Sequence, residues 1–402
     1  MKPRLDLIYI ESGGGHRAAA LALAEVIREQ KRPWELRLLS IQELLDSIDF
    51  IQKFTGIPFQ DVYNIMLRRG WTAGSAQLIP LMHLVIRLFH RKQVRMFEQY
   101  WAREKPAMVV SLIPHYNRAL KQAIQRAAPC APFVTLLTDI ADYPPHFWIE
   151  RQEQYVICGS PCAAAQAREI GIPAGRILRT SGMILSPKFY EPISVNRAVE
   201  HKRLGLRPDL PTGLVLFGGE GSQEMVRIAK ALNREGNRIQ LILLCGKNAP
   251  VAAELRRLPR RIPMFVEGFT REVPYYMELA DFFIGKPGPG CLSEALAKRL
   301  PVIVQRNAWT MAHERYNADW IEEQGAGLVV HNFSREIPAA VRKLLAPENY
   351  LRFRERAGAT QNAAVYEIPS LLESILIEAR GQQRDSESGF AARSLPDTVR
   401  LA

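Results

Sequence analysis

Short apolar runs rich in β-branched residues alternate with longer helical patterns along most of this chain, and the alternation limits the folds that it can adopt. The run 5–10 precedes an Ala- and Leu-rich helical pattern from Ala18, and the run 108–113 precedes another from Asn117. Two more runs follow at 133–138 and 155–158. This alternation is typical of βαβ units, whose strands pair in parallel. The sequence therefore predicts an α/β fold.

The alternation stops over residues 187–211, which are rich in Pro and charged residues, and then starts again. The later apolar runs lie at 214–217, 240–245, 264–266, 282–284, 302–305 and 328–330. A chain of 402 residues has room for about two to three domains. We predict two doubly wound, Rossmann-like domains facing a cleft, over residues 1–187 and 188–380. Residues 381–402 lack apolar periodicity and are predicted to form a mobile tail.

Lys and Arg outnumber Asp and Glu by 53 to 41, which gives a net charge of +12 and favours an anionic partner. A nucleic acid is disfavoured, because aromatic residues make up only 8% of the chain and no helix-turn-helix, zinc or RNA-binding motif is present. The five cysteines are scattered without metal-ligand spacing. The N-terminus lacks a signal-peptide pattern, and no apolar run is long enough to cross a membrane. We expect a cytoplasmic protein without a metal site.

A glycine-rich loop stands between the first predicted strand and the first predicted helix. It consists of Gly13, Gly14 and Gly15, followed by His16. Glycines let a backbone approach a ligand closely, and a helix N-terminus favours an anion or a polar oxygen. The loop matches neither the Walker pattern nor the dinucleotide-binding pattern. We interpret it as an acceptor or phosphate loop, with a plain tight turn as the alternative.

A second glycine-rich loop follows the apolar run 282–284 and precedes a predicted helix. It carries Lys286, Gly288 and Gly290, and Glu294 lies one turn into the helix. The glycines can direct backbone N–H groups at a diphosphate, while a carboxylate can accept hydrogen bonds from ribose hydroxyls. The loop therefore predicts a nucleotide site, with a merely rigid loop as the alternative.

Three further polar segments follow predicted strands of the C-terminal domain. They contain Gly218, Gly219 and Glu220, then Gly246 and Lys247, and then His313, Glu314 and Asn317. Loops that follow parallel strands converge at one edge of the sheet. The first two segments are therefore predicted to complete the nucleotide pocket. The third segment is predicted to bind sugar hydroxyls, with a solvated helix start as the alternative.

Several motifs occur in an order that resembles a known family. They are SGGGHRAAA, LLCGKN, GKPGPG continuing as CLSEALAKRLPVIV, HERYNADW with a following GAG, and QNAAVYEIP. Over roughly residues 5–377, the chain resembles the monogalactosyldiacylglycerol synthase and diacylglycerol glucosyltransferase group of glycosyltransferase family 28.

The resemblance implies a GT-B fold with an N-terminal acceptor domain and a C-terminal nucleotide-sugar domain. It also implies an inverting, metal-independent hexosyltransferase without a cofactor. Such an enzyme moves galactose or glucose from a UDP-sugar to diacylglycerol or a related membrane lipid. Three alternatives stay open: a polyprenyl-linked acceptor, isomerisation of a UDP-sugar, and a non-catalytic nucleotide-sugar-binding protein.

Two positions on the acceptor side depart from the family pattern. Ile113 and Tyr143 stand where the family has histidines, whereas Tyr63 with Asn64 and Thr138 with Asp139 match it. Isoleucine and tyrosine cannot repeat the chemistry of an imidazole. The departures therefore leave the donor chemistry in place and the identity of the acceptor lipid open.

His16 is the predicted general base that takes the proton from the acceptor hydroxyl. An imidazole with a pKa near ~6.5 suits proton transfer close to neutrality, and the glycines before it leave room for an acceptor. Asp139 follows another strand of the same domain, so it could orient the imidazole or act as the base itself.

A basic amphipathic pattern spans residues 80–95. Apolar residues recur there at helical spacing beside Arg87, Arg91, Lys92 and Arg95. A helix of this kind suits an anionic bilayer surface, and a core-packed helix with a solvated basic face is the alternative. With the lipid acceptor, the pattern predicts peripheral association with the inner face of the membrane.

Overall fold

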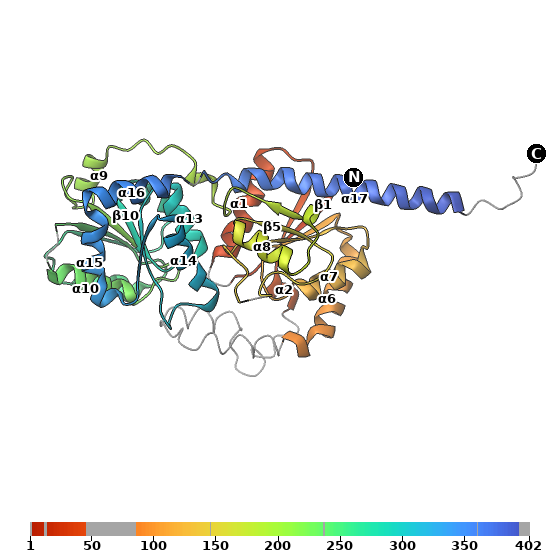
Figure 1. Ribbon diagram of the computed structural model, residues 1–402, viewed down its shortest axis with the longest axis horizontal. Helices are drawn as coiled ribbons and strands as arrows, with labels where there is room; N and C mark the ends of the chain where they lie inside the picture. Colours follow the sequence, from red (N-terminus) through yellow and green to blue (C-terminus); the bar gives the residue numbers. More distant parts are fainter. Residues whose placement is uncertain are drawn as a thin grey trace, which may run out of the picture.

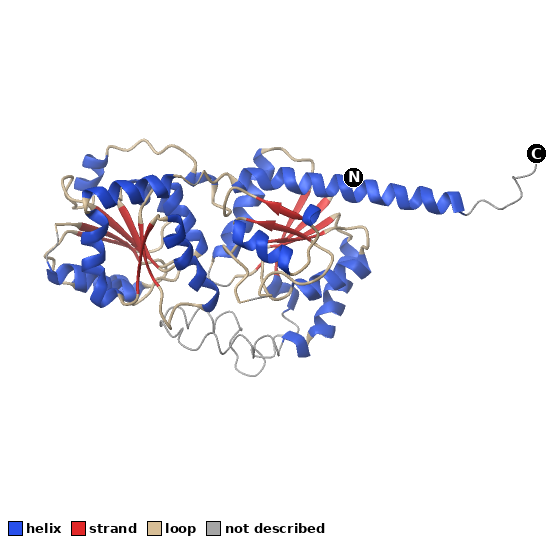
Figure 2. Cartoon of the chain, in the orientation of Figure 1, coloured by secondary structure: helices blue, strands red, loops and turns tan. Residues whose placement is uncertain are grey.

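The computed structural model describes residues 2–11, 14–45, 86–144, 146–235, 238–359 and 361–393, with side chains up to residue 382. These residues form two six-stranded sheets in which every strand pairing is parallel. Helices cover both faces of each sheet (Figure 2). The predicted α/β fold with two doubly wound sheets is confirmed.

The first sheet has the strand order β2-β1-β3-β4-β5-β6. Its strands are β1 (Arg4–Tyr9), β2 (Glu35–Ser40), β3 (Met108–Ser111), β4 (Phe133–Leu136), β5 (Tyr155–Cys158) and β6 (Ile177–Arg179). The helices are α1 (Gly15–Glu29), α2 (Ile41–Leu45), α6 (His90–Glu104), α7 (Asn117–Ala127) and α8 (Pro161–Glu169), with short 3-10 turns at Ala174–Arg176 and Pro187–Phe189. Sequence analysis does not predict β2 and β6, because these edge strands are half-exposed and lack a continuous apolar run.

The second sheet has the strand order β12-β11-β10-β7-β8-β9. Its strands are β7 (Thr212–Leu216), β8 (Gln240–Leu244), β9 (Met264–Glu267), β10 (Phe282–Gly285), β11 (Val302–Gln305) and β12 (Gly327–Val330). The helices are α9 (Arg197–Arg203), α10 (Glu224–Glu235), α11 (Ala249–Arg257), α12 (Val273–Glu278), α13 (Pro289–Ala297), α14 (Arg315–Gln324), α15 (Phe333–Leu345) and α16 (Pro347–Gly358), with a 3-10 turn η3 (Ala312–Glu314). All six strands overlap the apolar runs identified in the sequence.

The core of the second sheet lies on both of its faces. In β7, Val215 packs into one apolar cluster, whereas Leu214 and Leu216 pack into another. Successive side chains of a strand point to opposite faces, so a strand covered on both sides must be apolar throughout. This burial explains why the strands appear in the sequence as uninterrupted apolar runs.

The last helix, α17 (Ala364–Arg393), returns from the second sheet to the first. It lies along the N-terminal half and extends past it (Figure 1). Ile368 and Leu372 of α17 share an apolar cluster with Leu23 of α1. Residues from 364 onward thus pack on the first sheet, whereas the predicted C-terminal domain ran to residue 380. The helix also continues to Arg393, into the segment predicted to be a mobile tail, although its buried contacts in the cluster shared with α1 end at Leu376.

Candidate active site

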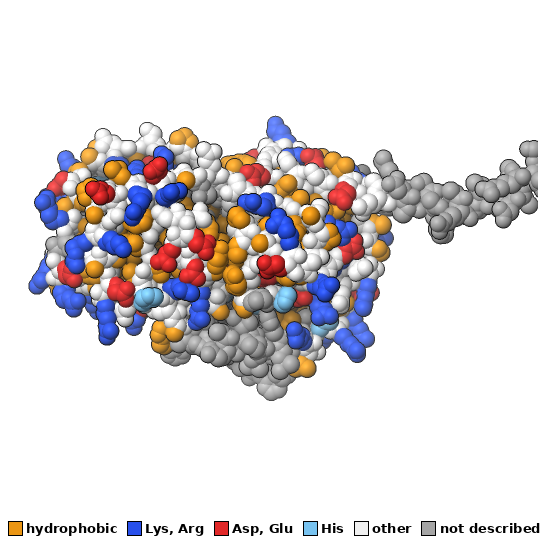
Figure 3. All heavy atoms as spheres, viewed as in Figure 1, with side chains coloured by type: hydrophobic (Ala, Val, Ile, Leu, Met, Phe, Trp, Pro, Cys, Tyr) orange, Lys and Arg blue, Asp and Glu red, His pale blue; other side chains and the backbone are white. Residues whose placement is uncertain are grey.

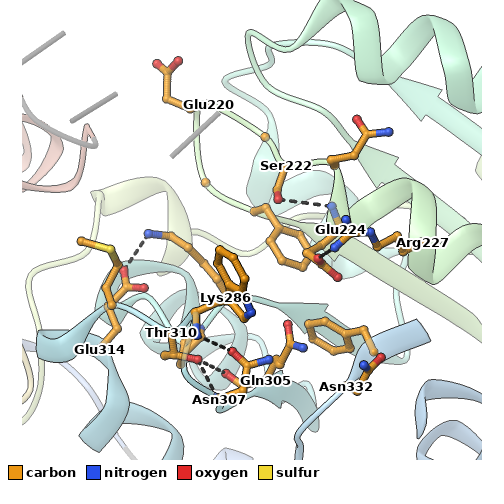
Figure 4. Close-up of a pocket in the computed structure, with 18 of the residues that line it drawn as sticks. Glu220, Ser222, Glu224, Arg227, Lys286, Gln305, Asn307, Thr310, Glu314 and Asn332 are labelled. Carbon is orange, nitrogen blue, oxygen red and sulfur yellow. Dashed lines mark hydrogen bonds and ion pairs between the residues drawn. The ribbon is translucent and has the colours of Figure 1, made fainter. Parts of the chain in front are cut away.

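A cavity of about 480 Å³ opens at the carboxyl edge of the second sheet (Figure 4). The loops that follow β7, β10, β11 and β12 form its walls. Four residues predicted for the nucleotide pocket line it, Gly218, Gly219, Glu220 and Lys286, together with Glu314, which was predicted to bind sugar hydroxyls. Carboxyl ends of parallel strands are the usual place for a ligand in open α/β sheets. The position of the cavity therefore agrees with the predicted nucleotide site.

Two glycine-containing loops, 218–221 and 246–247, pack closely against each other beside the cavity. Gly221 has a φ of +61°, and a Cβ atom there would lie 2.3 Å from the carbonyl oxygen of Cys245. A Cβ atom on Gly246 would lie 2.2 Å from the carbonyl oxygen of Gly219. The Lys247 N–H donates to that same oxygen at 2.8 Å. Gly246 and Lys247 therefore support the 218–221 loop from behind and are not among the residues that line the cavity.

An ion pair stands within the cavity wall. Lys286 Nζ lies 2.6 Å from Glu314 Oε1, and Figure 4 shows the lysine reaching across to the carboxylate. Glu314 is only 5% exposed. Burial acts to raise the pKa of Glu314, but the charges of Lys286 and His313 outweigh it and hold the pKa below its usual value. Glu314 is therefore ionised at neutral pH and holds the lysine in place.

The start of α13 forms another part of this edge. Gly288 is the N-cap residue and provides no side-chain cap, and a Cβ atom on Gly290 would meet nothing within 4 Å. The Asn317 Nδ2 group donates to the carbonyl oxygen of Pro287 at 2.8 Å. Its Oδ1 atom is buried without a hydrogen-bond partner among the described residues. Asn317 thus braces the loop beneath the open helix N-terminus.

Glu294 lies on α13, one turn beyond Gly290. Burial raises the pKa of its carboxyl group to about 7, and no described residue forms a hydrogen bond with it. Glu294 as a whole is only half-buried and is not among the residues that line the cavity. A ligand that donates hydrogen bonds would stabilise its charged form.

The carboxyl edge of the first sheet carries the predicted base. His16 lies in the first turn of α1, directly after Gly14 and Gly15, and Gly14 has a φ of +81°. The His16 Nδ1 atom lies 2.7 Å from the hydroxyl oxygen of Thr138. Gly13 lies outside the described residues, as do Tyr63 and Asn64.

Asp139 and His16 both contact Trp148. The Trp148 Nε1–H donates to Asp139 Oδ2 at 2.8 Å, and the Trp148 ring lies 5.7 Å from the His16 ring. Burial lowers the pKa of His16, the Asp139 carboxylate acts to raise it, and His313 lowers it further. The result lies below the usual value, so the imidazole is neutral and able to accept a proton at neutral pH.

The two edges meet across the cleft. His313, from the turn before α14, stacks on Phe147 of the N-terminal half with ring centroids 5.4 Å apart. Tyr143 and Tyr316 form a second pair at 5.3 Å. His313 therefore lies at the boundary between the halves and is not among the residues that line the cavity.

Several residues that line the cavity lie outside the segments predicted from the sequence. Arg227 lies near the start of α10, Gln305 ends β11 and Asn307 follows it, and Asn332 and Ser334 follow β12. Ser222, Trp309 and Thr310 also line the cavity and lie within the loops predicted after β7 and β11. Polar residues directly after a predicted strand are the available signal, since the same rule identified Gly218 and Lys286. The backbone and side chain of Thr310 and Asn307 hold this loop in shape, which leaves Trp309 55% exposed at the cavity.

The predicted membrane residues Arg87, Arg91, Lys92 and Arg95 are all exposed. They lie just before or within α6, whose Val94, Phe97 and Trp101 are buried in a cluster shared with α7. Lys and Arg side chains gather on the lower part of the N-terminal half in the space-filling view (Figure 3). Leu88 is 71% exposed next to them. The apolar residues before 86 lie outside the described residues.

Two negative findings concern the described part of the chain. No helix there is both long and apolar enough to span a membrane. No group of three or more His, Cys, Asp or Glu side chains there is placed to hold a metal ion.

Comparison with known proteins defines the class of this chain. Residues 214–368 match the glycosyltransferase family 28 C-terminal domain. The chain is 28% identical over 387 residues to a protein named probable monogalactosyldiacylglycerol synthase 3 from Oryza sativa subsp. japonica, covering 90% of this chain and 72% of the relative. It is 26% identical to monogalactosyldiacylglycerol synthase 1 from Arabidopsis thaliana, covering 86% of this chain and 64% of the relative.

Solved structures show the same fold. An S. aureus MnaA–UDP structure superposes with a TM-score of 0.62 at 16% identity, covering 93% of this chain and 97% of the other. Acinetobacter baumannii MurG superposes with a TM-score of 0.58 at 14% identity, covering 92% and 100%. The chain is a glycosyltransferase with the GT-B fold. Its second half carries the family 28 C-terminal domain, and the predicted resemblance to this family is confirmed.

Proposed function

We propose that this glycosyltransferase transfers a hexose, galactose or glucose, from a UDP-sugar to diacylglycerol or a related membrane lipid. The observation that carries the proposal is the arrangement of the two sheet edges. A polar, glycine-lined cavity on one edge lies across the cleft from a half-buried, neutral imidazole on the other. The relatives are named monogalactosyldiacylglycerol synthases, which supports a lipid acceptor.

The donor half would bind the nucleotide diphosphate through backbone and charge. The uncapped N-terminus of α13 offers free N–H groups, and Lys286 supplies a positive charge in the cavity. Glu294 would accept hydrogen bonds from the ribose hydroxyls, since it is half-buried and no described residue hydrogen-bonds to its carboxyl group. Glu314 and the polar residues beyond β11 would contact the hexose.

The acceptor half would supply the proton transfer. The acceptor hydroxyl oxygen forms a bond to the anomeric carbon as the bond from that carbon to the UDP oxygen breaks. UDP leaves with the bonding electron pair, and the hydroxyl proton passes to His16 or Asp139. Attack from the face opposite UDP inverts the anomeric carbon. Lys286 and the helix N-terminus stabilise the departing diphosphate, so we propose that neither a metal nor another cofactor takes part.

The acceptor lipid would be reached at the inner face of the membrane. Arg87, Arg91, Lys92 and Arg95 are exposed beside Leu88, and together they offer basic and apolar groups to an anionic bilayer. A cytoplasmic enzyme of this kind would make peripheral contact with the lipid phase that holds its acceptor.

The test uses the purified full chain with vesicles that contain either diacylglycerol or a polyprenyl-linked acceptor. Radiolabelled UDP-galactose and UDP-glucose are supplied separately, and label in the organic phase is measured with and without EDTA. We expect label with the diacylglycerol vesicles, a β-linked product, and no effect of EDTA. Label only with the polyprenyl-linked vesicles would show that the acceptor is polyprenyl-linked and not diacylglycerol. UDP binding without any transfer would instead indicate a nucleotide-sugar-binding protein.

A further inference from the structure

Phe147 lies between two histidines from different halves of the molecule. The ring of His313, from the donor half, stacks on it at 5.4 Å with an interplanar angle of 13°. The ring of His115, from the acceptor half, meets it edge-on at 4.1 Å, and the His115 N–H donates to the Phe147 carbonyl oxygen at 2.9 Å. The side chain is 6% exposed, so it is held firmly on the acceptor side while it presents one face to the donor side.

Both partners of this stack are sequence neighbours of the reacting groups. Trp148 follows Phe147, donates a hydrogen bond to Asp139 and packs on His16. Glu314 follows His313 and forms the ion pair with Lys286 in the cavity. A shift of the stack would therefore be passed directly to both sides of the transfer step.

A second pair of rings fixes the angle of approach. Tyr143 meets Tyr316 at 5.3 Å, and the pKa of each phenol is raised by burial together with a hydrogen bond to Cys162. Tyr143 lies four residues before Phe147, and Tyr316 lies three residues after His313. Two contacts between the same two segments prevent the rotation that a single stack would allow.

We propose that Phe147 is a positioning residue for glycosyl transfer: its stack with His313 sets the acceptor-side pair His16 and Asp139 against the donor-side pair Lys286 and Glu314. This inference rests on the proposed function. Phe147 touches none of the groups proposed to react and acts through its two neighbours. Misplacing reacting groups by about 1 Å is enough to cost ~10²-fold in rate.

The contact also carries a titration signature. The groups that act on His16 are Asp139, His313, the Thr138 hydroxyl and the backbone of Leu112. Within this set His313 lowers the pKa of His16, because a second positive charge nearby disfavours protonation. If the stack is lost and His313 moves away, the pKa of His16 rises. Loss of burial would also raise the pKa of His16, so His313→Gln, which leaves Phe147 in place, separates the two causes.

The experiment compares Phe147→Ala and Phe147→Leu with Phe147→Tyr, which keeps the ring, and with His313→Gln. Phe265→Leu removes a similar stack on Tyr276 within one half and serves as the matched control. We expect Phe147→Ala to lower kcat by about 10–100-fold with the KM for the UDP-sugar changed by less than about threefold. Phe147→Tyr should restore most of kcat, and Phe265→Leu should stay near the starting enzyme.

The titration of His16 is followed by NMR in the same variants without any substrate. We expect its midpoint to move to higher pH in Phe147→Ala and in His313→Gln, with no further shift in the double variant. Unchanged midpoints would overturn the inference even if no acceptor is found. Normal transfer by Phe147→Ala would also overturn it while leaving the proposed function intact. If Phe147→Ala fails to fold, His313→Gln decides the matter.

Discussion

The carboxyl edges of the two sheets have the same architecture and opposite character. The first is filled by side chains that bond to each other, such as His16 with Thr138 and Trp148 with Asp139. The second is opened by glycine loops into a cavity of about 480 Å³. Partial burial and neighbouring charges shift the pKa of His16 at the first edge, whereas an open edge lined by backbone N–H groups accepts a charged ligand. One fold used twice thus separates proton transfer from donor binding.

Removing the imidazole tests the acceptor edge and has the largest expected effect. His16→Ala should lower kcat by about 10²–10⁴-fold, because positioned proton transfer contributes about that much. The affinity for UDP, measured by calorimetry, should stay near that of the starting enzyme because UDP binds at the other edge. Asp139→Asn is the companion variant. If His16→Ala keeps full turnover and Asp139→Asn abolishes it, the base is Asp139.

The second-largest expected effect is on membrane binding, which should depend on basic residues of the N-terminal half and not on those of the other half. Replacing Arg87, Arg91, Lys92 and Arg95 with Gln should lower the affinity for anionic vesicles, measured by sedimentation, by about 10²–10³-fold, since each basic side chain near the surface contributes up to ~1 kcal/mol. The matched control replaces four exposed arginines of the other half: Arg234, Arg238, Arg260 and Arg261. Equal losses in the two variants would mean that the excess positive charge of the whole chain drives binding.

At the donor edge, replacing the lysine of the ion pair should affect the affinity for the UDP-sugar more than replacing the lysine of the supporting loop. Lys286→Met removes the cavity charge and leaves Glu314 buried without its partner, so the affinity for the UDP-sugar should fall about 10–100-fold. Lys247→Met changes a lysine outside the cavity and should alter the affinity less than about threefold. Calorimetry measures both. A larger loss in Lys247→Met would move the diphosphate toward the 246–247 loop.

The smallest expected effect is the pH dependence of the affinity for UDP. The pKa of Glu294 is raised to about 7 by burial, so the carboxylate forms as the pH rises through neutrality. Because only the carboxylate accepts hydrogen bonds from both ribose hydroxyls, UDP affinity should rise a few-fold between about pH 6 and pH 8. Glu294→Gln should remove that rise. A rise that persists in Glu294→Gln would assign it to another group, such as the UDP phosphates.

Much of the donor edge could be predicted from local sequence. Gly218, Lys286 and Glu314 each follow a buried strand, and parallel strands bring their carboxyl ends together. The polar loops after β11 and β12 obey the same rule, but Asn307 and Asn332 resemble ordinary turn residues in a single sequence. Gly246 was predicted to contact the nucleotide, because glycine allows a close approach. In the structure, the group that approaches it closely is the backbone of Gly219.

The sequence alone determined the two parallel sheets, because strands covered on both faces must be apolar along their whole length. It also determined the glycine loops, since a φ of +81° at Gly14 suits few other residues. Only the tertiary structure decided that α17 returns to α1 and that Phe147 stacks on His313. Those partners lie more than 100 residues apart, and no local period or turn residue encodes which distant surface a helix or ring will meet.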